Sequence, residues 1–423
     1  MVILKNRSFK TIFTNTASQL IVRLTTSSAA FLATIIIAYF FGLKLFGSYT
    51  KIITFVSFFY LLIDFGINPI FLREYRQNLE KYILNLINLR FVISLVLILI
   101  VYLISRFLPY EPQSDTGFSL YEKTGILIFS FTIISYGLIL SLNSLLQKNL
   151  NYKVSVLPNL ISSVILILLI IIGGLQKNLF IILSAFFISG LITFFLTYIV
   201  CRKKFSLRLT IVKDPEFNKK ILLSSLPLGI MLFVNLIYFK ADTFILSLYK
   251  PSIDVGIYGF SYKIFEFIIA LPTFFSNSVY PILLDKEKNR TEFNKHIKDY
   301  FLILFTFSLF GMIATFFLSP ILAFIKIDFI NAVLPLKILS FSLPFFFLTS
   351  LFQWVYIIDN KKNLLLGIYS VCMIVNIVLN IILIPKYSYI SSAYITVFSE
   401  GLVLALMLAF LYIFKRENKT NGK

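Results

Sequence analysis

The sequence predicts an all-α integral membrane protein of about 12 transmembrane helices, in two six-helix lobes related by a pseudo-twofold axis along the membrane normal. Three observations lead to this fold class. Hydrophobic residues make up 58% of the 423 residues and the mean hydropathy is +0.90, too apolar for a soluble protein of this length. Apolar stretches long enough to cross about 30 Å of hydrocarbon recur from end to end. A weak repeat also relates the two halves of the chain.

Each apolar stretch is expected to form one membrane-spanning helix of roughly 20 residues or more. The first stretch is longer than a signal peptide and lacks a small-residue cleavage site, so we expect it to stay in the mature protein. The predicted spans are 14–41, 47–71, 81–108, 123–147, 153–174, 177–201, 221–247, 254–284, 297–325, 333–358, 361–384 and 389–414.

The net charge of +20 is concentrated in particular loops. Most of the 39 lysines and arginines lie in the tails and in the even-numbered loops, including "CRKKFSLRLTIVKDPEFNKK" at 201–220 and "DKEKNRTEFNKHIK" at 285–298. The positive-inside rule therefore predicts that both termini are cytoplasmic. Such tracts fix the topology and contact the headgroups of anionic phospholipids, so nucleic acid is not an expected partner.

A repeat divides the chain near its middle. "FGSY" at 46–49, which opens the second span, matches "VGIY" at 255–258, which opens the eighth, about 210 residues later. Because each half has an even number of spans, both halves enter the membrane from the same side and the repeat is parallel. The predicted domains are a six-helix lobe at 1–201, a cytoplasmic linker at 202–220, and a second lobe with a short tail at 221–423. Duplicated bundles of this kind favour transport.

A few charged residues lie inside the predicted spans, where charge usually faces a bundle interior or a wet cavity. Basic residues and one acid of this set are candidates for binding a substrate in a cavity, and the other acids are candidates for ion coupling. The cavity candidates are Arg23, Arg90, Lys240, Asp242, Lys263 and Lys337, and the ion-coupling candidates are Asp64, Glu266 and Glu400.

Lys240 and Asp242 are two residues apart, about 200° around a helix, so they cannot neutralise each other on one face. Lys240 lies nearer the outer end of its span, where a long side chain reaches the interface. Asp242 is too short to do so. We therefore expect Asp242 to face a wet cavity, with a satisfied interhelical hydrogen bond as the alternative.

Lys263 and Glu266 are three residues apart on one helix face, which favours an intrahelical pair that lowers the cost of insertion. Arg23 and Arg90 lie at similar depth in spans that start in the cytoplasm, and neither has an acid three or four residues away. Two guanidinium groups without local partners suit an anion such as phosphate, which they bind bidentately. An interhelical pair with Asp64 is the alternative.

Few residues of the sequence are suited to ion coupling or to cofactor chemistry. Glu400, near the middle of the last span, suits a carrier of H⁺ or Na⁺ and equally suits a protonated, hydrogen-bonded carboxyl. The two cysteines, Cys201 and Cys372, and the single histidine, His296, are too few for a zinc site and give no cysteine-based nucleophile–base pair. No cofactor is expected beyond a coupling ion.

Two stretches resemble known transporter motifs. "FFGLKLFGSYTKIITFVSFFYLLIDFGINPIFLREYR" at 40–76 resembles the second-helix region of bacterial polysaccharide flippases, with Gly-x-Tyr, then Asp-Phe-Gly and a basic helix end. "DVGIYGFSYKIFEFIIALPTFFSNSVYPILL" at 254–284 repeats it, preceded by "SSLPLGIMLFVNLIYFKADTFIL", which resembles the family's seventh helix. The chain is therefore similar, along its whole length, to the multidrug/oligosaccharidyl-lipid/polysaccharide exporter superfamily. The matching positions are Pro227, Gly229, Asp242, Gly256 and Tyr258.

The resemblance implies two lobes with alternating access. In the polysaccharide branch it implies transfer of undecaprenyl-diphosphate-linked oligosaccharide repeat units, such as those of O-antigen and lipopolysaccharide, from the inner to the outer leaflet of the bacterial plasma membrane. It also implies a cationic cavity for the diphosphate, coupling to H⁺ or Na⁺ in some members, and polysaccharide polymerase machinery as a partner. Arg23 and Arg90 fit this chemistry by residue type and depth, although they match no family motif.

Two other functions stay open. A cation- or drug-coupled antiporter of the same superfamily is the nearer alternative, although the bases outnumber the acids within the spans, which is less suited to a cationic substrate. A membrane glycosyltransferase or repeat-unit polymerase is the remote alternative. Such an enzyme needs a sizeable outer loop to hold sugar, and the longest here, "PYEPQSDTGFSLYEK", is short. Enzyme activity is therefore not expected.

Overall fold

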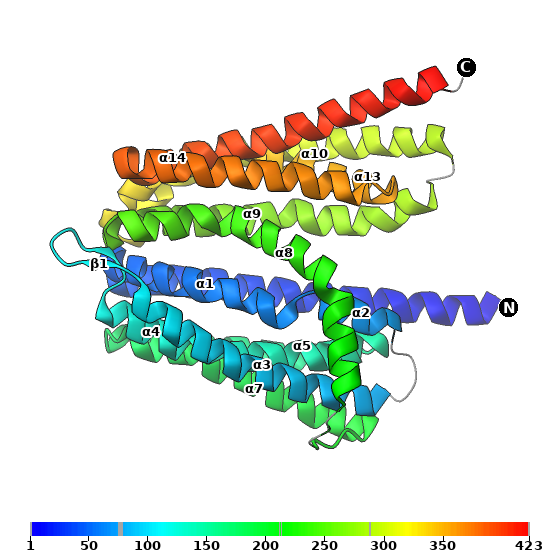
Figure 1. Cartoon of the computed structure of the whole chain (residues 1–423), viewed down its shortest axis with the longest axis horizontal. Coiled ribbons are helices and arrows are strands. Elements are labelled where there is room, and N and C mark those ends of the chain that lie inside the picture. Colours follow the sequence, from blue (N-terminus) through cyan, green and yellow to red (C-terminus); the bar gives the residue numbers. More distant parts are fainter. Residues whose placement is uncertain (1, 75–78, 211, 213, 287–288, 422–423) are drawn as a thin grey trace. The chain divides into compact units, whose positions relative to one another are not determined.

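The computed structural model describes residues 2–74, 79–210, 212, 214–286 and 289–421, and these are almost entirely helical (Figure 1). Two short strands form a hairpin between the third and fourth helices. Short 3₁₀ helices occupy Tyr152–Ser155, Ser319–Ile321 and Ile327–Ala332. The main elements are α1 (Val2–Asp64), α2 (Ile67–Glu74), α3 (Leu79–Phe107), β1 (Tyr110–Glu111), β2 (Thr116–Gly117), α4 (Leu120–Ser130), α5 (Thr132–Lys148), α6 (Val156–Leu175), α7 (Leu179–Phe205), α8 (Pro215–Tyr249), α9 (Ser252–Asp285), α10 (Arg290–Leu318), α11 (Leu322–Ile325), α12 (Val333–Ser340), α13 (Leu343–Ile358) and α14 (Lys362–Asn421).

The helices are long and apolar enough to cross a membrane many times. Over the described ranges, nine helical segments meet this requirement, and a tenth is formed by Ile327–Ser340 and Leu343–Ile358, which are bent by 46°. Two of these segments, in α1 and α14, each contain an internal break. Counting both sides of each break gives twelve spans, so the predicted all-α, multi-pass membrane fold is confirmed.

The two internal breaks lie where the sequence predicted short loops between consecutive spans. Gly42 has φ 67° and ψ −175°, a left-handed φ that glycine adopts without a steric penalty. Ser388 has φ 54° and ψ −145° and follows Pro385 by three residues. Proline lacks a backbone N–H and disrupts the preceding turn. The chain therefore reverses within a helical segment at each point, with almost no loop between the arms.

Contacts between Cα atoms divide the chain into two compact units, which are described separately. Unit 1 comprises Met1–Phe41, Ser48–Gln113 and Gly117–Leu236, and unit 2 comprises Gly42–Gly47, Ser114–Thr116 and Ile237–Lys423. Helix α8 contributes residues to both. The sequence-based boundaries, with a linker at 202–220, differ from this division and stay a prediction.

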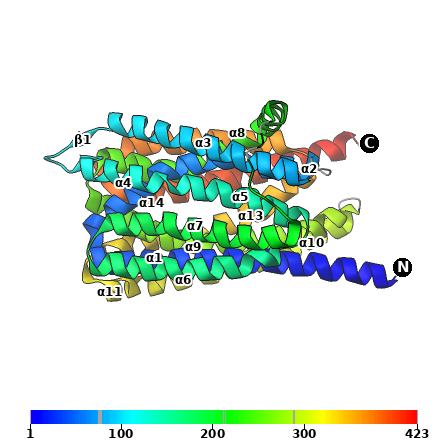
Figure 2. The same ribbon diagram turned by 90° about the horizontal axis from the view of Figure 1, so that it is seen from below.

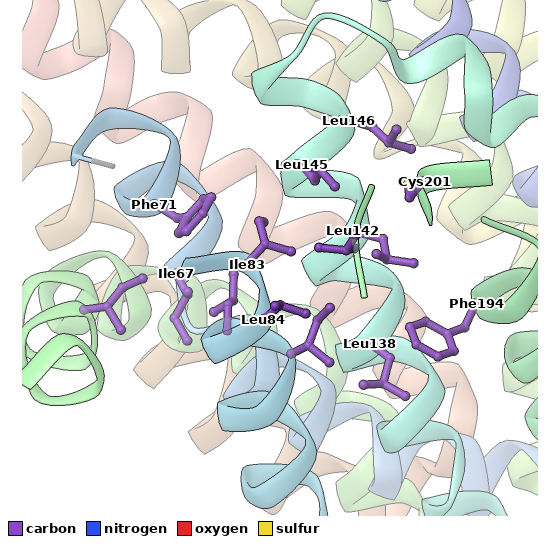
Figure 3. Close-up of a cluster of buried hydrophobic side chains, with 14 of the residues drawn as sticks. Ile67, Phe71, Ile83, Leu84, Leu138, Leu142, Leu145, Leu146, Phe194 and Cys201 are labelled. Atoms are coloured by element: carbon purple, nitrogen blue, oxygen red, sulfur yellow. The ribbon is translucent and has the colours of Figure 1, made fainter. Parts of the chain in front are cut away.

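Unit 1 is held by apolar side chains of α2, α3, α5 and α7. Figure 2 shows α4 continuing into α5, and α6 lying beside α7. In the close-up of Figure 3, Phe71 of α2 and Ile83 of α3 point toward Leu142 of α5, with Cys201 of α7 nearby. All four are fully buried. The free thiol of Cys201 therefore acts as a small apolar group that fills the core.

The start of α8 is fixed by a side-chain cap. Asp214 precedes Pro215, and its Oδ1 accepts a hydrogen bond from the Phe217 amide at 3.1 Å. Such a cap satisfies one amide of the first turn, and proline is favoured at the first helical position. Lys81 of α3 lies 3.1 Å from Asp214 Oδ2. The Phe217 amide, and after it Lys81, lower the pKa of the Asp214 carboxyl.

The two glycines of the repeated Gly-x-Tyr motif lie against each other in unit 2. A Cβ on Gly47 would overlap the carbonyl oxygen of Ser252 and lie 3.0 Å from the Gly256 nitrogen. A Cβ on Gly256 would overlap the carbonyl oxygen of Leu43. The motif is therefore a close backbone crossing that only glycine allows.

We expect Gly47→Ala and Gly256→Ala each to destabilise the protein by about 1–3 kcal/mol, the usual cost of overpacking. Gly367→Ala is the matched control, because a Cβ there would meet nothing within 4 Å. Alanine in place of a helical glycine is expected to be neutral or to stabilise by about 0.5–1 kcal/mol. Thermal unfolding of the three purified variants in detergent measures the difference. Equal melting temperatures for all three would contradict the crossing.

Candidate functional site

Three charged residues that the sequence identified as candidates lie together in unit 2. Lys240 comes from α8, and Lys263 and Glu266 come from α9. Nζ of Lys240 lies 2.5 Å from Oε1 of Glu266, and Nζ of Lys263 lies 2.7 Å from Oε2. Each carboxylate oxygen therefore receives one ammonium group. We call this group the lysine–glutamate triad.

The triad carries one positive charge in excess, because two ammonium groups share one carboxylate. The side chains of Lys240, Lys263 and Glu266 are 17%, 30% and 31% exposed, so a ligand can reach them. The ring of Tyr262 lies 5.7 Å from Nζ of Lys240, and its π face stabilises the ammonium group. An excess positive charge within membrane-spanning helices favours the approach of an anion.

The intrahelical Lys263–Glu266 pair expected from the spacing is present in the triad. Lys240 was expected to extend its side chain to the membrane interface. In the structure it pairs with Glu266 instead. The reason is that α9 places a carboxylate within reach, and pairing inside the bundle offsets much of the cost of burying an ammonium group. The sequence of α8 alone does not contain this information.

Asp242 was expected to face a wet cavity, but the residue is only 3% exposed. Its Oδ1 accepts hydrogen bonds from the Thr243 amide at 2.6 Å and the Thr243 hydroxyl at 3.2 Å. Its Oδ2 accepts a hydrogen bond from the hydroxyl of Tyr258 on α9. The structure therefore shows the alternative, a satisfied interhelical hydrogen bond. Tyr258 is the tyrosine of the repeated motif.

An oxygen-rich cluster continues from this carboxylate into α14. The Tyr258 hydroxyl lies 3.3 Å from Oγ1 of Thr396. Oγ of Ser392, one turn earlier on α14, is buried without a hydrogen-bond partner. No group of three or more His, Cys, Asp or Glu side chains suited to a metal ion occurs among the residues searched in the described part of the chain. Asp242 therefore lies beside neutral oxygens.

Arg90, on α3 in unit 1, is fully buried and already has partners. Its Nη2 lies 3.6 Å from Oδ1 of Asp64 and donates to Oδ1 of Asn68 at 2.8 Å. Its Nη1 donates to the Ser141 hydroxyl, and its Nε donates to the carbonyl of Ile63, both at 3.3 Å. Arg90 was expected to bind the substrate anion because it has no acid three or four residues away, but its acidic partner comes from another helix. The interhelical pair with Asp64 is present.

Two further basic residues, Arg23 and Lys337, have no ion pair in the described part of the chain. Arg23, on α1, is exposed. Lys337, on α12, is half-buried, and its Nζ lies 4.9 Å from the centroid of the Phe316 ring. Neither has an ion-pair partner within the ranges that the structure describes. Arg23 and Arg90 thus differ in environment, although the sequence placed them at similar depth.

Glu400, on α14, has a different environment from the other two ion-coupling candidates. Asp64 and Glu266 lie in ion pairs, whereas Glu400 is 2% exposed and has hydroxyl partners. Its Oε2 accepts a hydrogen bond from Tyr238 of α8 at 2.8 Å, and its Oε1 accepts one from Thr349 of α13 at 2.7 Å. Three helices of unit 2 thus meet at this carboxyl.

One buried ion pair in unit 1 was missed by sequence reasoning. Nζ of Lys51 lies 3.5 Å from Oε1 of Glu122, and the side chains are 0% and 2% exposed. Lys51 also donates to the Gly117 carbonyl at 2.7 Å, and Ser48 donates to Glu122 at 3.0 Å. Lys51 lies near the start of the predicted span 47–71 and Glu122 just before the span 123–147, and neither was among the candidate residues. The capping box formed by Ser119 and Glu122 is the signal that could have located the acid.

A groove of about 320 Å³ lies along α14 and does not coincide with these charges. Leu379 and Leu383 line it from one arm, and Tyr394 and Phe398 from the other. No charged side chain lines this groove. Because the groove offers no charge to bind an anion, the triad is the stronger candidate site for an anionic substrate.

Comparison with known protein families identifies the chain. The family described as polysaccharide biosynthesis protein matches residues 12–286. The chain belongs to this family. A second family, MatE, matches residues 227–382. Membership of the polysaccharide biosynthesis family confirms the superfamily expected from the Pro-x-Gly and Gly-x-Tyr motifs, and the triad lies within both matched regions.

Solved transporters share the fold of this polysaccharide biosynthesis family member. The structure of "Lipid II flippase MurJ, inward closed conformation" has a TM-score of 0.75 and 18% identity, over 94% of this chain and 87% of that chain. An inward-facing multidrug resistance MATE family transporter of the MOP superfamily has a TM-score of 0.66 and 13% identity, over 93% and 96%. A MOP superfamily transporter from Pyrococcus furiosus has a TM-score of 0.59 and 15% identity, over 96% and 95%. No curated protein sequence matches this chain.

Proposed function

We propose that the protein is a flippase that moves undecaprenyl-diphosphate-linked oligosaccharide repeat units from the inner to the outer leaflet of the bacterial plasma membrane by alternating access. The observation that carries this proposal is the lysine–glutamate triad, an accessible positive charge inside membrane-spanning helices. Membership of the polysaccharide biosynthesis family and the likeness to a lipid II flippase support it.

The triad suits a diphosphate for electrostatic reasons. Each ammonium group offers three donors and binds a phosphate oxygen as a point charge. Without substrate, Glu266 accepts from Lys240 and Lys263 and lowers the cost of holding both charges in the membrane. When a diphosphate arrives, either lysine exchanges its carboxylate oxygen for a phosphate oxygen. Binding is therefore an exchange between anions, which favours reversible release on the other side.

The remaining basic residues have different proposed roles. Arg23 and Lys337 have no ion-pair partner in the described ranges, so they are candidate contacts for the diphosphate or the sugar. Arg90 is occupied by Asp64, Asn68 and backbone oxygen. We assign it the role of holding α1, α2 and α3 together, and thus of supporting the substrate path indirectly.

The proposed orientation follows from the charged loops. Cytoplasmic termini place the basic segments 201–220 and 285–298 against anionic phospholipids of the inner leaflet. Polymerase machinery would then receive the repeat unit on the outer side. The chain itself is proposed to catalyse no covalent step, and translocation needs none.

A cation- or drug-coupled antiporter is the second candidate function, and the MatE match at residues 227–382 favours it. The charge of the triad argues against it, because a cationic substrate would meet an excess of positive charge. Buried Asp242 is occupied by Tyr258 and Thr243, so it presents no accessible acid in its place.

Deletion of the gene in its own host tests the proposed function. In a host that has no related flippase, we expect surface polysaccharide to be lost and the lipid-linked repeat unit to accumulate in the inner leaflet, because a charged diphosphate does not cross the hydrocarbon unaided. Labelling of intact and permeabilised cells with a sugar-specific lectin measures both. Normal surface polysaccharide in a deletion strain that has no related flippase would contradict the proposal.

A further inference from the structure

We propose that Glu400 is a proton-binding site whose occupancy is linked to the position of α8, so that a proton gradient drives translocation. This rests on the proposed function only in that the chain must be a transporter. The site is the carboxyl of Glu400 with the hydroxyls of Tyr238 and Thr349. Its ligand is a proton.

The first argument is the absence of a compensating cation. The other titratable groups that act electrostatically on Glu400 are the hydroxyls of Tyr238, Tyr262 and Tyr369 and the thiol of Cys372. They come from α8, α9 and α14, while α13 contributes the neutral Thr349, and none of these groups is basic. In the described ranges Glu400 has no ion pair. Burying a charged carboxylate so deeply is costly, and binding a proton removes that cost.

The second argument is that both protonation states keep their hydrogen bonds. As a carboxylate, Glu400 accepts from Tyr238 and from Thr349. As a carboxylic acid, it donates its proton to one hydroxyl oxygen and still accepts from the other, because a hydroxyl group both donates and accepts. Proton release breaks one O–H bond of the carboxyl and transfers H⁺ to water, and uptake is the reverse. No other bond changes.

The third argument links this proton to conformation. Tyr238 lies on α8, the helix that is shared by unit 1, up to Leu236, and unit 2, from Ile237. Pro227 interrupts the backbone hydrogen bonds of the same helix. A shift of α8 that withdraws the Tyr238 hydroxyl would remove one of the two donors that stabilise the carboxylate. Proton uptake and the shift of α8 therefore favour each other, because linkage is reciprocal.

The experiment has two parts, and the first does not depend on the substrate. Infrared difference spectra of the purified full-length protein, recorded between acid and alkaline pH, should show a protonated carboxyl band that is lost in Glu400→Gln. Tyr238→Phe, which removes only one donor, should keep the band and move its titration to higher pH. Asp242→Asn, which changes a buried acid on α8, is the matched control and should leave the Glu400 band in place. An unchanged band in Glu400→Gln would overturn the proposal, as would a Tyr238→Phe variant with an unshifted titration.

The second part measures coupling in proteoliposomes that hold a lipid-linked oligosaccharide. An imposed proton gradient should accelerate transport severalfold, and Glu400→Gln should lose this acceleration. Transport that ignores the proton gradient but follows a sodium gradient would overturn the proposal in favour of the oxygen-rich cluster of Asp242, Tyr258 and Thr396. Wild-type protein that shows the infrared band but moves no lipid-linked oligosaccharide would contradict the proposed function and leave the proton site standing.

Discussion

Replacing Lys263 by glutamine is expected to lower transport of the lipid-linked oligosaccharide by roughly 10- to 150-fold. The remaining Lys240–Glu266 pair is neutral, so the site loses its excess positive charge. It also loses one charge-assisted hydrogen bond to the substrate, worth about 1.5–3 kcal/mol. Transport rates of Lys263→Gln and wild type in proteoliposomes, at equal protein content, measure the effect.

Two comparison variants separate substrate binding from folding. Lys263→Arg keeps the charge and should retain a large part of the activity. Lys286→Gln removes an ion pair of similar length, 2.8 Å, that is outside the predicted spans, and should leave transport unchanged. If Lys263→Gln transports as well as wild type while remaining folded, the triad is not the anion site.

Replacing Arg90 by alanine is expected to destabilise the protein by about 3–5 kcal/mol, the usual cost of removing one partner of a buried ion pair. The change would leave Asp64 without its cation and would remove one of the two donors to Oδ1 of Asn68, the other being the Ser144 hydroxyl. Most of the protein should therefore fail to accumulate in the membrane. Abundance in membranes and the melting temperature of the solubilised protein both report this loss.

Arg23→Ala is the matched control for Arg90→Ala, because Arg23 is exposed and has no ion pair in the described ranges. It should keep normal abundance and a normal melting temperature, with any effect confined to transport. Combining Arg90→Met with Asp64→Asn should restore much of the lost stability, since no unpaired charge is then left. A stable Arg90→Ala protein that binds substrate poorly would show that Arg90 contacts the diphosphate after all.

The fold could be predicted from the sequence because it depends on long apolar runs, and each run is a local property of one segment of the chain. The same is true of the Lys263–Glu266 pair, whose three-residue spacing fixes both side chains on one helix face. The positions of the breaks at Gly42 and Ser388 agree with the predicted links between spans. The sequence did not predict that these links would be almost without a loop, because loop length depends on a few backbone angles.

The partners of charges on different helices could not be predicted in the same way. The pairs Arg90–Asp64 and Lys240–Glu266 depend on which helices are neighbours and on how each is rotated. The sequence therefore overestimated how many basic residues were free for substrate. The hydrogen bond between Tyr258 and Asp242 could have been inferred from the sequence. Both residues were matched to the family's motifs, but the Tyr258 hydroxyl was not considered as a partner of Asp242.

The most direct test of the proposed function is translocation by the purified protein alone. Proteoliposomes would carry an undecaprenyl-diphosphate-linked oligosaccharide, and a membrane-impermeant enzyme that trims the sugar would report the fraction on the outer leaflet over time. We predict that the wild-type protein makes the inner-leaflet pool accessible and that Lys263→Gln does so much more slowly. An inner-leaflet pool that stays protected, with the same protein transporting a cationic drug, would contradict the flippase and favour the antiporter.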